Sequence, residues 1–521
     1  LLMNSLFCFH IKIRTLTPLS KKFASMKNFV ACADRVKGTK PSIWVEMSAL
    51  VNKYDAVNLG QGFTDFRPPA YFTDQLSKAA QSTDYKLNQY TRGYVGHLPL
   101  VEVIGKFYTS LLDHPVNPLN EVLITNGAYQ ALFYAAFAFI NHGDEAIIIE
   151  PYYDCYEPQV RMAGGKPIFT SLKLNSKNVA TCSSGDFKLD FTELENKVTP
   201  RTKLLYLNNP LNPIGKVYNR DELMQIAAFV KKHNLIVVAD EVYEWLVYEG
   251  SEMIRFASLP DMWERTITIG SAGKTFSLTG WKMGWAICPE NLMIHLRSVH
   301  QNCVYTCATP IQCAMADSFQ YEIDRFQTKE CYFHEMRRIL QSKRRVLQEM
   351  LSEHGFMPVL PEGGYFMVAN FCALSDLFPQ NDNEPLDYQF TRWLCSEKKL
   401  GVIPMTAFYS DENKHFGENY VRFCFFKMSS KEKNNSSVGA DADTDLETLK
   451  DFLRQYSRIS EQCFIDCVHD FTTRSVTVRE ENCVSNCLEK YLKVLQRISQ
   501  RFHEYQLIQA EATGNLPLGN K

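Results

Sequence analysis

The sequence predicts an α/β fold: a mostly parallel sheet with helices on both faces, a smaller α+β domain and a C-terminal α-helical hairpin. The first observation is that short apolar segments, which predict strands, alternate along the chain with segments of helical spacing. The predicted strands lie near 145–149, 203–207, 235–239, 266–270 and 283–287. The second is the unbroken apolar run at 235–239, which is typical of a parallel strand buried on both faces. The third is that polar residues follow the strands, where open α/β sheets bind ligands.

The first such strand end is Ile124-Thr-Asn-Gly127-Ala128-Tyr129, which runs into an apolar helix. Free N–H groups and the helix dipole make such a helix start a phosphate site, although a plain strand-to-helix turn is the alternative. After the strand at 203–207, the prolines and Gly215 force an irregular loop that can aim the Asn212 amide at a ligand hydroxyl. A plain turn is again the alternative.

Asp240 directly follows the strand at 235–239. A carboxylate at this edge can pair with a protonated pyridine nitrogen, whereas taken alone it is more often a helix N-cap. Tyr243 places a phenol within about one helical turn of it.

The segment from Ser271 to Lys282 follows the strand at 266–270 and holds a hydroxyl, glycines and two lysines. Lys274 can form a Schiff base with a carbonyl cofactor while Lys282 neutralises its phosphate. Burial and a second cation lower a lysine's pKa, as a nucleophile requires. Ser-x-x-Lys also occurs in penicillin-binding serine enzymes, but the accompanying Ser-Asp-Asn and Lys-Thr-Gly motifs are absent from the sequence.

In this order, these motifs resemble the class I aminotransferases, which are fold-type I pyridoxal-phosphate enzymes with an aspartate aminotransferase-like fold. The segments 58–63, 87–91, 149–157, 263–274 and 421–425 resemble the kynurenine aminotransferase subgroup. Members of that subgroup also act as glutamine transaminases and cysteine-S-conjugate β-lyases. The resemblance covers about Val30 to Lys427.

The resemblance implies the cofactor pyridoxal 5′-phosphate and a role for each motif residue. Lys274 carries the cofactor and moves the proton, Asp240 holds the ring nitrogen, and Asn212 and Tyr243 bind the ring hydroxyl. The remaining cofactor contacts are the stacking ring of Tyr153 and a phosphate site of Ser271, Lys282, the amides of Ala128 and Tyr129, and Tyr90 from the partner subunit of a homodimer.

For the substrate, the resemblance implies that Arg422 clamps the α-carboxylate as a bidentate fork, while Gly62 and Trp44 line the entrance. Tyr305-Thr306 replaces a Phe-His pair of the mammalian relatives beside this pocket. We therefore expect transamination of kynurenine, glutamine or aromatic and sulfur amino acids with a 2-oxo acid. A β-lyase side reaction would differ only in the substrate's leaving group.

We expect a basic leader at 1–29, the enzyme at 30–427, a linker at 428–445, a helical hairpin at 446–509 and a tail at 510–521. Within the enzyme, the large domain would span about 70–324 and the small domain 30–69 plus 325–427. Residues 325–355 show helical spacing, with Arg337, Lys343 and Arg345 on a solvated face.

Net charge and composition limit the classes of binding partner that the sequence predicts. A net charge of −2 gives no reason to expect nucleic acid or a membrane surface, and no apolar run approaches the roughly 20 residues of a transmembrane helix. Twelve of the 16 cysteines are scattered before residue 430 without metal-like spacing, as in proteins of reducing compartments. No metal site is expected in the enzyme part.

The last four cysteines form two Cys-x-x-x-Cys pairs, each on one face of a helix. In an antiparallel hairpin they could form the disulfides Cys463–Cys487 and Cys467–Cys483, or four thiolates could bind zinc. Residues 446–509 resemble the small Tim chaperones of the mitochondrial intermembrane space, of the Tim9 type. That resemblance implies a disulfide-closed hairpin that assembles with Tim10-type subunits and escorts membrane-protein precursors.

The two parts imply different compartments. The basic, acid-free residues 1–33 are typical of a mitochondrial presequence, or are untranslated sequence ahead of Met26. The enzyme half is expected in mitochondria or cytoplasm, and the tail in the intermembrane space. An import chaperone is accordingly the alternative function, and a joined gene model would explain the two redox requirements.

Overall fold

The computed structural model describes residues 32–37, 42–91, 95–175, 182–381 and 383–427, and residues 467, 479, 480, 482–484, 486, 487, 490 and 497 of the C-terminal segment. The expected leader, the linker, Cys463 and the final tail lie outside the described residues. The domain boundaries stay predictions.

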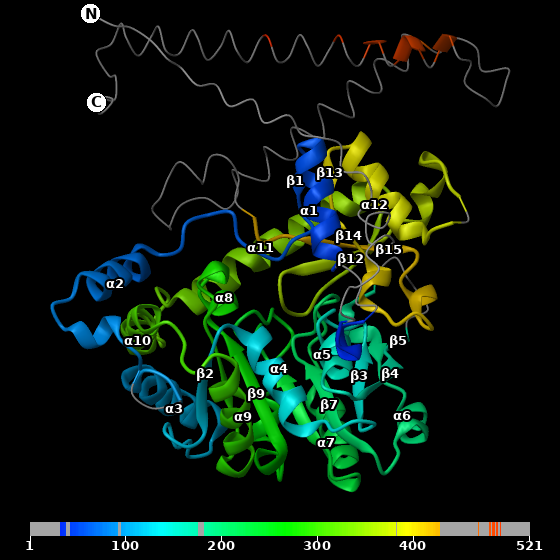
Figure 1. Ribbon diagram of the computed structural model, residues 1–521. Helices are drawn as coiled ribbons and strands as arrows, with labels where there is room; N and C mark the ends of the chain where they lie inside the picture. The colour runs from blue at the N-terminus through cyan, green and yellow to red at the C-terminus, as the bar shows by residue number, and fades with distance from the viewer. Residues whose placement is uncertain are drawn as a thin grey trace, which may run out of the picture.

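A seven-stranded sheet forms the centre of the enzyme, in the order β2-β10-β9-β8-β7-β3-β4 (Figure 1). Its strands are β2 (Val122–Thr125), β3 (Glu145–Glu150), β4 (Lys166–Ser171), β7 (Thr202–Asn208), β8 (Ile236–Asp240), β9 (Thr266–Ser271) and β10 (Gly284–Ile287). The run from β9 to β4 is parallel, and β10 is antiparallel to both of its neighbours. The predicted mostly parallel sheet is confirmed.

Helices cover both faces because successive strand residues point in opposite directions. Ile148, Leu204 and Val238 pack in one cluster with α4 (Ala128–Phe139), α5 (Tyr156–Met162) and α9 (Glu290–Cys303). Ile147 and Leu205 pack in another with α6 (Phe191–Lys197) and α7 (Arg220–Lys232). The other large-domain helices are α2 (Ala70–Gln81), α3 (Leu98–Leu112), α8 (Ala272–Thr275) and α10 (Thr309–Asp324).

A second sheet is antiparallel, in the order β11-β12-β15-β14. It consists of β11 (Met357–Val359), β12 (Phe366–Asn370), β14 (Ile403–Pro404) and β15 (Tyr420–Cys424), with α11 (Tyr332–Glu353) and α12 (Leu386–Glu397). The N-terminal α1 (Ile43–Tyr54) and β1 (Val57–Asn58) join this part, since β1 pairs with β13 (Leu400–Gly401). A short pair, β5 (Lys173–Leu174) and β6 (Phe187–Lys188), completes the strands of the described ranges.

The helix expected at 325–355 is α11, and the sequence pattern predicts the exposure of one of its charged side chains wrongly. Arg337 and Arg345 are exposed as predicted, but Lys343 is buried and its ammonium donates to the Lys427 carbonyl at 2.8 Å. The prediction of a solvated Lys343 is therefore wrong, because its long side chain crosses to the backbone after β15.

In the C-terminal segment the described residues are helical, and Cys467 and Cys483 form a disulfide. This confirms one of the two predicted pairs and rules out zinc ligation by those two sulfurs. Cys487 is also disulfide-bonded. Within the parts of the chain that the structure describes, no helix is long and apolar enough to cross a membrane.

Candidate active site

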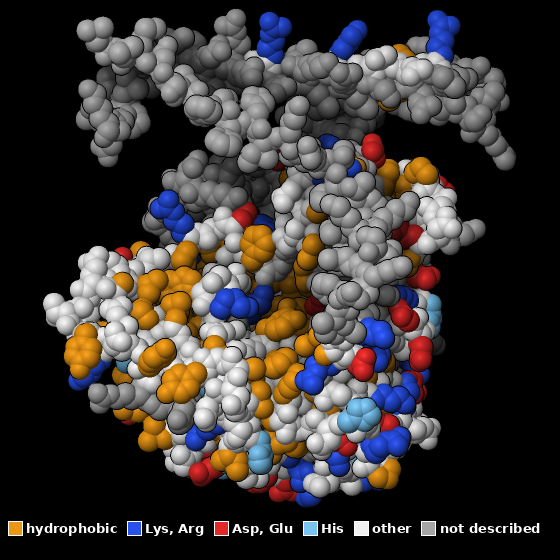
Figure 2. All heavy atoms as spheres, in the orientation of Figure 1, with side chains coloured by type: hydrophobic (Ala, Val, Ile, Leu, Met, Phe, Trp, Pro, Cys, Tyr) orange, Lys and Arg blue, Asp and Glu red, His pale blue; other side chains and the backbone are white. Residues whose placement is uncertain are grey.

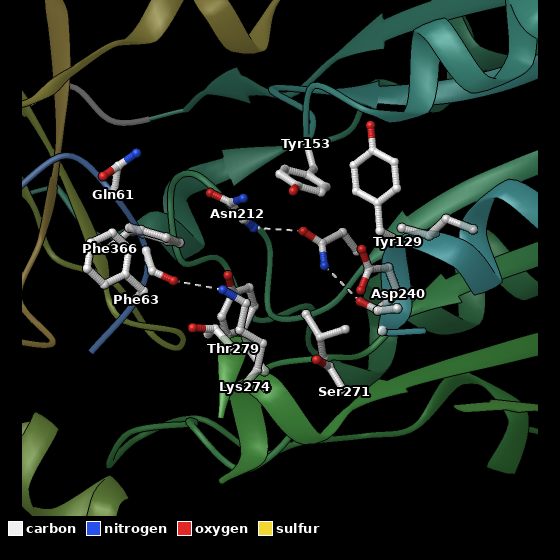
Figure 3. A pocket seen from close by; sticks show the side chains of 18 of the residues that line it. Gln61, Phe63, Tyr129, Tyr153, Asn212, Asp240, Ser271, Lys274, Thr279 and Phe366 are labelled. Atoms are coloured by element: carbon white, nitrogen blue, oxygen red, sulfur yellow. Dashed lines mark hydrogen bonds between the residues drawn. The ribbon is translucent and has the colours of Figure 1, made fainter. Parts of the chain in front are cut away.

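A cavity of about 340 Å³ opens at the carboxyl ends of β7, β8 and β9, a size common among ligand sites (Figure 3). It is lined by nearly all of the residues that the sequence singles out: Trp44, Gly62, Ala128, Tyr129, Tyr153, Asn212, Asp240, Tyr243, Ser271, Lys274, Lys282 and Arg422. Tyr90 does not line this cavity and is 79% exposed. The fold thus gathers side chains that are as many as 378 positions apart, from Trp44 to Arg422, in one space.

Lys274 stands on the short helix α8, directly after β9. Its Nζ donates to the carbonyl oxygen of Gly62 at 2.8 Å and to the hydroxyl of Tyr365 at 2.7 Å. Burial lowers the pKa of this amine to about 8, and the charges of Arg422 and Lys282 act in the same direction. Near neutral pH an appreciable fraction of the amine is therefore unprotonated and nucleophilic.

Asp240 ends β8, and its two carboxylate oxygens have different surroundings. Oδ2 accepts a 2.5 Å hydrogen bond from the Tyr156 hydroxyl, while the buried Oδ1 has no partner. Burial raises the pKa of Asp240 to about 6, against the lowering effect of Tyr156. An unpartnered buried carboxylate oxygen that lines a cavity is suited to a ligand N–H.

The opposite end of the cavity is suited to an anion. The helix α4 begins at Ala128 after Gly127, whose φ of +77° glycine tolerates best, and the first N–H groups of a helix lack intrahelical acceptors. A Cβ atom on Gly127 would lie 3.5 Å from Lys282 Nζ, so this ammonium lies beside the helix start. Ser271 lines the same region.

Arg422 is fully buried on β15 and fixed on several sides. Nη1 donates to Asn212 Oδ1 at 2.7 Å and Nη2 to the Gly60 carbonyl at 2.8 Å, while Nε has no partner. Its guanidinium lies 3.8 Å from the ring centroid of Phe366, and Trp44 and Phe408 also flank it. Burial lowers the pKa of Arg422 to about 10. A buried guanidinium whose Nε–H still lacks a partner is a strong site for a carboxylate.

Aromatic rings form the walls between these groups. Trp44, Phe63, Tyr129, Tyr153 and Phe366 line the cavity. Figure 3 shows the Tyr153 ring above the space bounded by Asn212 and Asp240, with Phe63 and Phe366 on the side away from Asp240. The ligand therefore fits between flat apolar surfaces, and aromatic parts of a ligand are favoured.

Three contacts were not foreseen from the sequence: Tyr365 on Lys274, Tyr156 on Asp240, and Asp154, which accepts from Trp44 Nε1 at 2.9 Å. Tyr156 follows Tyr153 by one helical turn, which is a usable signal. Nothing local in the sequence relates Tyr365 to a lysine 91 positions before it.

Residues 54–436 match the family Aminotransferase class I and II, a range that covers most of the chain. The chain belongs to the class I and II aminotransferases. This aminotransferase is 46% identical over 417 residues to kynurenine–oxoglutarate transaminase 3 of Homo sapiens, with 80% of this chain and 90% of that protein covered. It is 45% identical over 400 residues to kynurenine–oxoglutarate transaminase 1 of Homo sapiens, with 76% and 94% covered.

Solved structures agree with the fold. Bna3p of Saccharomyces cerevisiae matches this aminotransferase with a TM-score of 0.72 at 28% identity, over 78% of this chain and 97% of that one. YbdL of Escherichia coli, described as having a methionine aminotransferase function, matches with a TM-score of 0.68 at 28% identity, over 78% and 98%. The predicted aspartate aminotransferase-like fold is confirmed.

The C-terminal segment has its own family match. Residues 444–504 match the Tim10/DDP family zinc finger, so the predicted joining of an aminotransferase to a small Tim module is confirmed. Despite the family's description, Cys467 and Cys483 form a disulfide in this structure. No group of three or more metal-ligating side chains occurs among the residues that the structure describes.

The cofactor of this aminotransferase is pyridoxal 5′-phosphate, and the cavity fits it. The unpartnered Asp240 Oδ1 suits a protonated ring nitrogen, and the N-terminus of α4 with Lys282 suits a phosphate. The partly deprotonated Lys274 suits an aldehyde. Each of the three groups that define this cofactor therefore has a matching side chain in one cavity.

Proposed function

We propose that this aminotransferase moves the amino group of kynurenine, glutamine or an aromatic or sulfur amino acid to a 2-oxo acid. The observation that carries the proposal is the placement of Lys274, Asp240 and Arg422 around one aromatic-lined cavity. The names of its relatives, kynurenine–oxoglutarate transaminases, support kynurenine as a donor.

Within this proposal each end of the cavity has a task. The chemistry supplied by bound pyridoxal phosphate is an aldehyde that accepts the amino group and a ring that withdraws electrons from the substrate's Cα. Asp240 keeps the ring nitrogen protonated, and Asn212 and Tyr243 hydrogen-bond the ring hydroxyl. Ser271, Lys282 and the amides of Ala128 and Tyr129 hold the phosphate.

Lys274 has two tasks in sequence. Its Nζ would hold the cofactor covalently through the aldehyde carbon, and once free it would act as the base that takes the proton from the substrate's Cα and as the acid that delivers a proton to the former aldehyde carbon on the other side of the amino nitrogen. A pKa of about 8 suits both tasks, because the amine then accepts and gives up a proton near physiological pH.

Arg422 and the aromatic walls orient the substrate. The guanidinium receives the α-carboxylate, which places the Cα–H bond toward Lys274. Trp44 and Gly62 close the entrance and exclude water. The same arrangement supports β-elimination from a cysteine S-conjugate, because only the substrate's leaving group differs.

A homodimer completes the proposal. In Figure 2 hydrophobic side chains gather on the face over α2, α3 and α10. Several large ones are exposed there or nearby: Tyr85, Tyr90, Leu98, Tyr305 and Tyr321. A second copy covering this face would bring Tyr90 to the phosphate end of its neighbour's cavity. Light scattering of the active enzyme tests this, and an active monomer would contradict it.

The proposal is tested by the absorption spectrum of the full-length protein before and after kynurenine or glutamine is added. A visible band that moves to the wavelength of the aminated cofactor supports it, and Lys274→Ala should lose both the band and turnover. Turnover of Lys274→Ala at the wild-type rate would contradict the role of this lysine.

For the tail, the Cys467–Cys483 disulfide favours a second function, that of an intermembrane-space import chaperone working with Tim10-type subunits. The enzyme would then reside in mitochondria, or in the cytoplasm if the two parts occur separately. Co-purification of the full chain with a Tim10-type subunit tests this, and an unoxidised tail in isolated mitochondria would contradict it.

A further inference from the structure

Tyr365 lies just before β12 and contacts the reactive atom of Lys274. Its hydroxyl oxygen accepts from Lys274 Nζ at 2.7 Å, and its own proton goes to the Gly62 carbonyl at 2.7 Å. Because Nζ also donates to that carbonyl at 2.8 Å, the three groups form a closed triangle. Within the described ranges, Tyr365 is the one side chain that hydrogen-bonds this amine.

The hydroxyl is held rigidly. Tyr365 is 1% exposed, and its ring packs against Tyr243 (centroids 5.1 Å), Phe366 (4.7 Å) and Phe426 (5.2 Å). Burial raises the pKa of Tyr365 well above its ordinary value, so the phenol stays neutral. A neutral phenol that donates to a carbonyl presents its oxygen to the amine, and packed rings cannot turn it away.

We infer that Tyr365 is a positioning residue, whose hydroxyl and the Gly62 carbonyl together form a dock for the Lys274 amine whenever that amine is not covalently bound. The inference rests on the proposed role of Lys274. Without such a dock, an unbound lysine side chain occupies many rotamers, and ordering it again for reaction with the cofactor costs conformational entropy. The dock also ties the amine to Gly62, the residue expected at the substrate entrance.

The dock has a measurable electrostatic effect. Two oxygen acceptors stabilise the ammonium form more than the neutral amine, so removal of one lowers the pKa of the amine. The other groups around Nζ are Asp240 and Cys424, which raise its pKa, Arg422 and Lys282, which lower it, and the neighbouring Tyr243. All of these remain in Tyr365→Phe, which keeps the ring and removes only the hydroxyl.

The test is competitive labelling of Lys274 in the full-length protein freed of cofactor, with reductive methylation between pH 6 and 11 and peptide mass spectrometry. We expect the midpoint for Lys274 to fall by about one pH unit in Tyr365→Phe, with recapture of added pyridoxal phosphate slowed several-fold at pH 9. Tyr134→Phe is the control, because its buried hydroxyl bonds His300 instead. Wild-type midpoint and recapture rate in Tyr365→Phe would overturn the inference.

If Tyr365→Phe does not fold, the double variant Lys274→Met/Tyr365→Phe tests whether the lost pairing with Lys274 is the cause. Replacement of both partners by apolar groups is close to neutral, whereas one partner left alone is costly. Recovery of folding in the double variant supports the pair, and failure to recover overturns it. The proposed function has a separate readout, because Lys274→Ala tests the cofactor linkage whatever Tyr365 does.

Discussion

At the scale of single residues, Asp240 shows how one carboxylate serves the protein and the ligand at once. Tyr156 occupies Oδ2 and leaves Oδ1 without a partner in the cavity. The phenol stacks on Tyr206 with centroids 4.9 Å apart, so its direction is fixed by packing. Tyr156 thus favours the charged form of Asp240 against the effect of burial, and its hydrogen bond leaves Oδ1 as the oxygen without a partner.

The pH dependence of cofactor binding follows from this arrangement. The pKa of Asp240 is raised to about 6 by burial, so below pH 6 the carboxyl is neutral and attracts a protonated ring nitrogen less. Affinity for pyridoxal phosphate should therefore rise as pH increases through 6. In Tyr156→Phe the carboxylate loses a stabilising hydrogen bond, and the midpoint should move upward by about one unit. Fluorescence titration at several pH values checks this, and a midpoint that moves downward would contradict it.

Arg422 makes a second prediction at this scale. Arg422→Lys keeps a positive charge, but a single ammonium cannot replace the planar fork of N–H donors, so Asn212 and Gly60 lose hydrogen-bond partners. A loss of about 3 kcal/mol in substrate binding corresponds to KM higher by about two orders of magnitude. Kinetics with an amino acid and with its decarboxylated amine measure the effect, which should vanish for the amine.

The sequence predicts which residues reach the site better than it predicts what they touch. Lys274, Asp240 and Arg422 follow or lie in strands, and strand ends of one sheet meet. The partners Tyr156, Tyr365 and Asp154 depend on how separate elements pack, which no local pattern encodes. Their effects on pKa and orientation therefore required the structure.

At the scale of elements, α1 connects the two parts of the enzyme. Its start is fixed to the large domain, because Asp154 accepts from Trp44 Nε1 at 2.9 Å and from Ser42 Oγ at 3.2 Å. Its Glu46 pairs with Arg392 of α12 at 2.5 Å. The helix therefore holds Trp44 over the cavity from both sides.

Loss of the first connection should be felt in substrate binding. Asp154→Ala leaves the Trp44 N–H without its partner, and we expect KM for aromatic donors to rise about tenfold, with a smaller change in kcat. Asp154→Asn is the matched control, because its amide oxygen can still accept from Trp44. Equal KM values for wild type and Asp154→Ala in steady-state assays would show that α1 is held without this bond.

The start of α7 gives a prediction for stability alone. Asn219 and Glu222 form a reciprocal capping box, a pattern that is legible in the sequence. Asn219→Ala should lower the free energy of unfolding by about 1 kcal/mol without changing kcat. Denaturant unfolding of the holoenzyme measures it, with Asn219→Ser as the control that retains a cap.

Two strands show where sequence patterns fail for elements. β4 was not predicted, because its sequence begins with Lys166 and Pro167 and ends in two hydroxyl residues, which leaves no apolar run. Pro is tolerated there because β4 is an edge strand. β10 was predicted as a strand, but its antiparallel direction follows from the short return through α8, which is no crossover helix. The same return carries Lys274 and Lys282 into the site.

At the scale of the whole molecule, the cavity draws on residues from 44 to 422, and none of its described lining residues lies further along the chain. Removal of residues 428–521 should therefore leave kcat and KM within about twofold of the full chain. A twofold change corresponds to about 0.5 kcal/mol, the usual effect of changes that lie away from buried features. Residue 427 must be kept, because the Lys427 ammonium donates to the Phe63 carbonyl at 2.6 Å. Loss of turnover on truncation would mean that the tail supports the enzyme fold.

The two parts also differ in the state of their sulfur atoms. Within the described enzyme ranges the cysteines are free, whereas Cys467 and Cys483 are joined. Alkylation of the unfolded, unreduced chain should therefore modify Cys155 and Cys424 but spare Cys467 and Cys483. Peptide mass spectrometry reads this out, and Cys467→Ser should make Cys483 reactive without altering turnover.

The long sequence separations in the cavity also set the order of events during synthesis. Gly60 and Arg422, which are hydrogen-bonded, are 362 positions apart, and Tyr365 follows Lys274 by 91. At roughly 5–20 residues per second, the ribosome places about 5–20 s between the lysine and its dock. During that interval the lysine and the Gly62 carbonyl are translated, but the Tyr365 hydroxyl that completes the dock is not. The side chains expected to hold pyridoxal phosphate, from Ala128 to Lys282, are thus translated before Tyr365 and Arg422, so the dock of the lysine and the carboxylate site of the substrate are the last parts of the cavity to be completed.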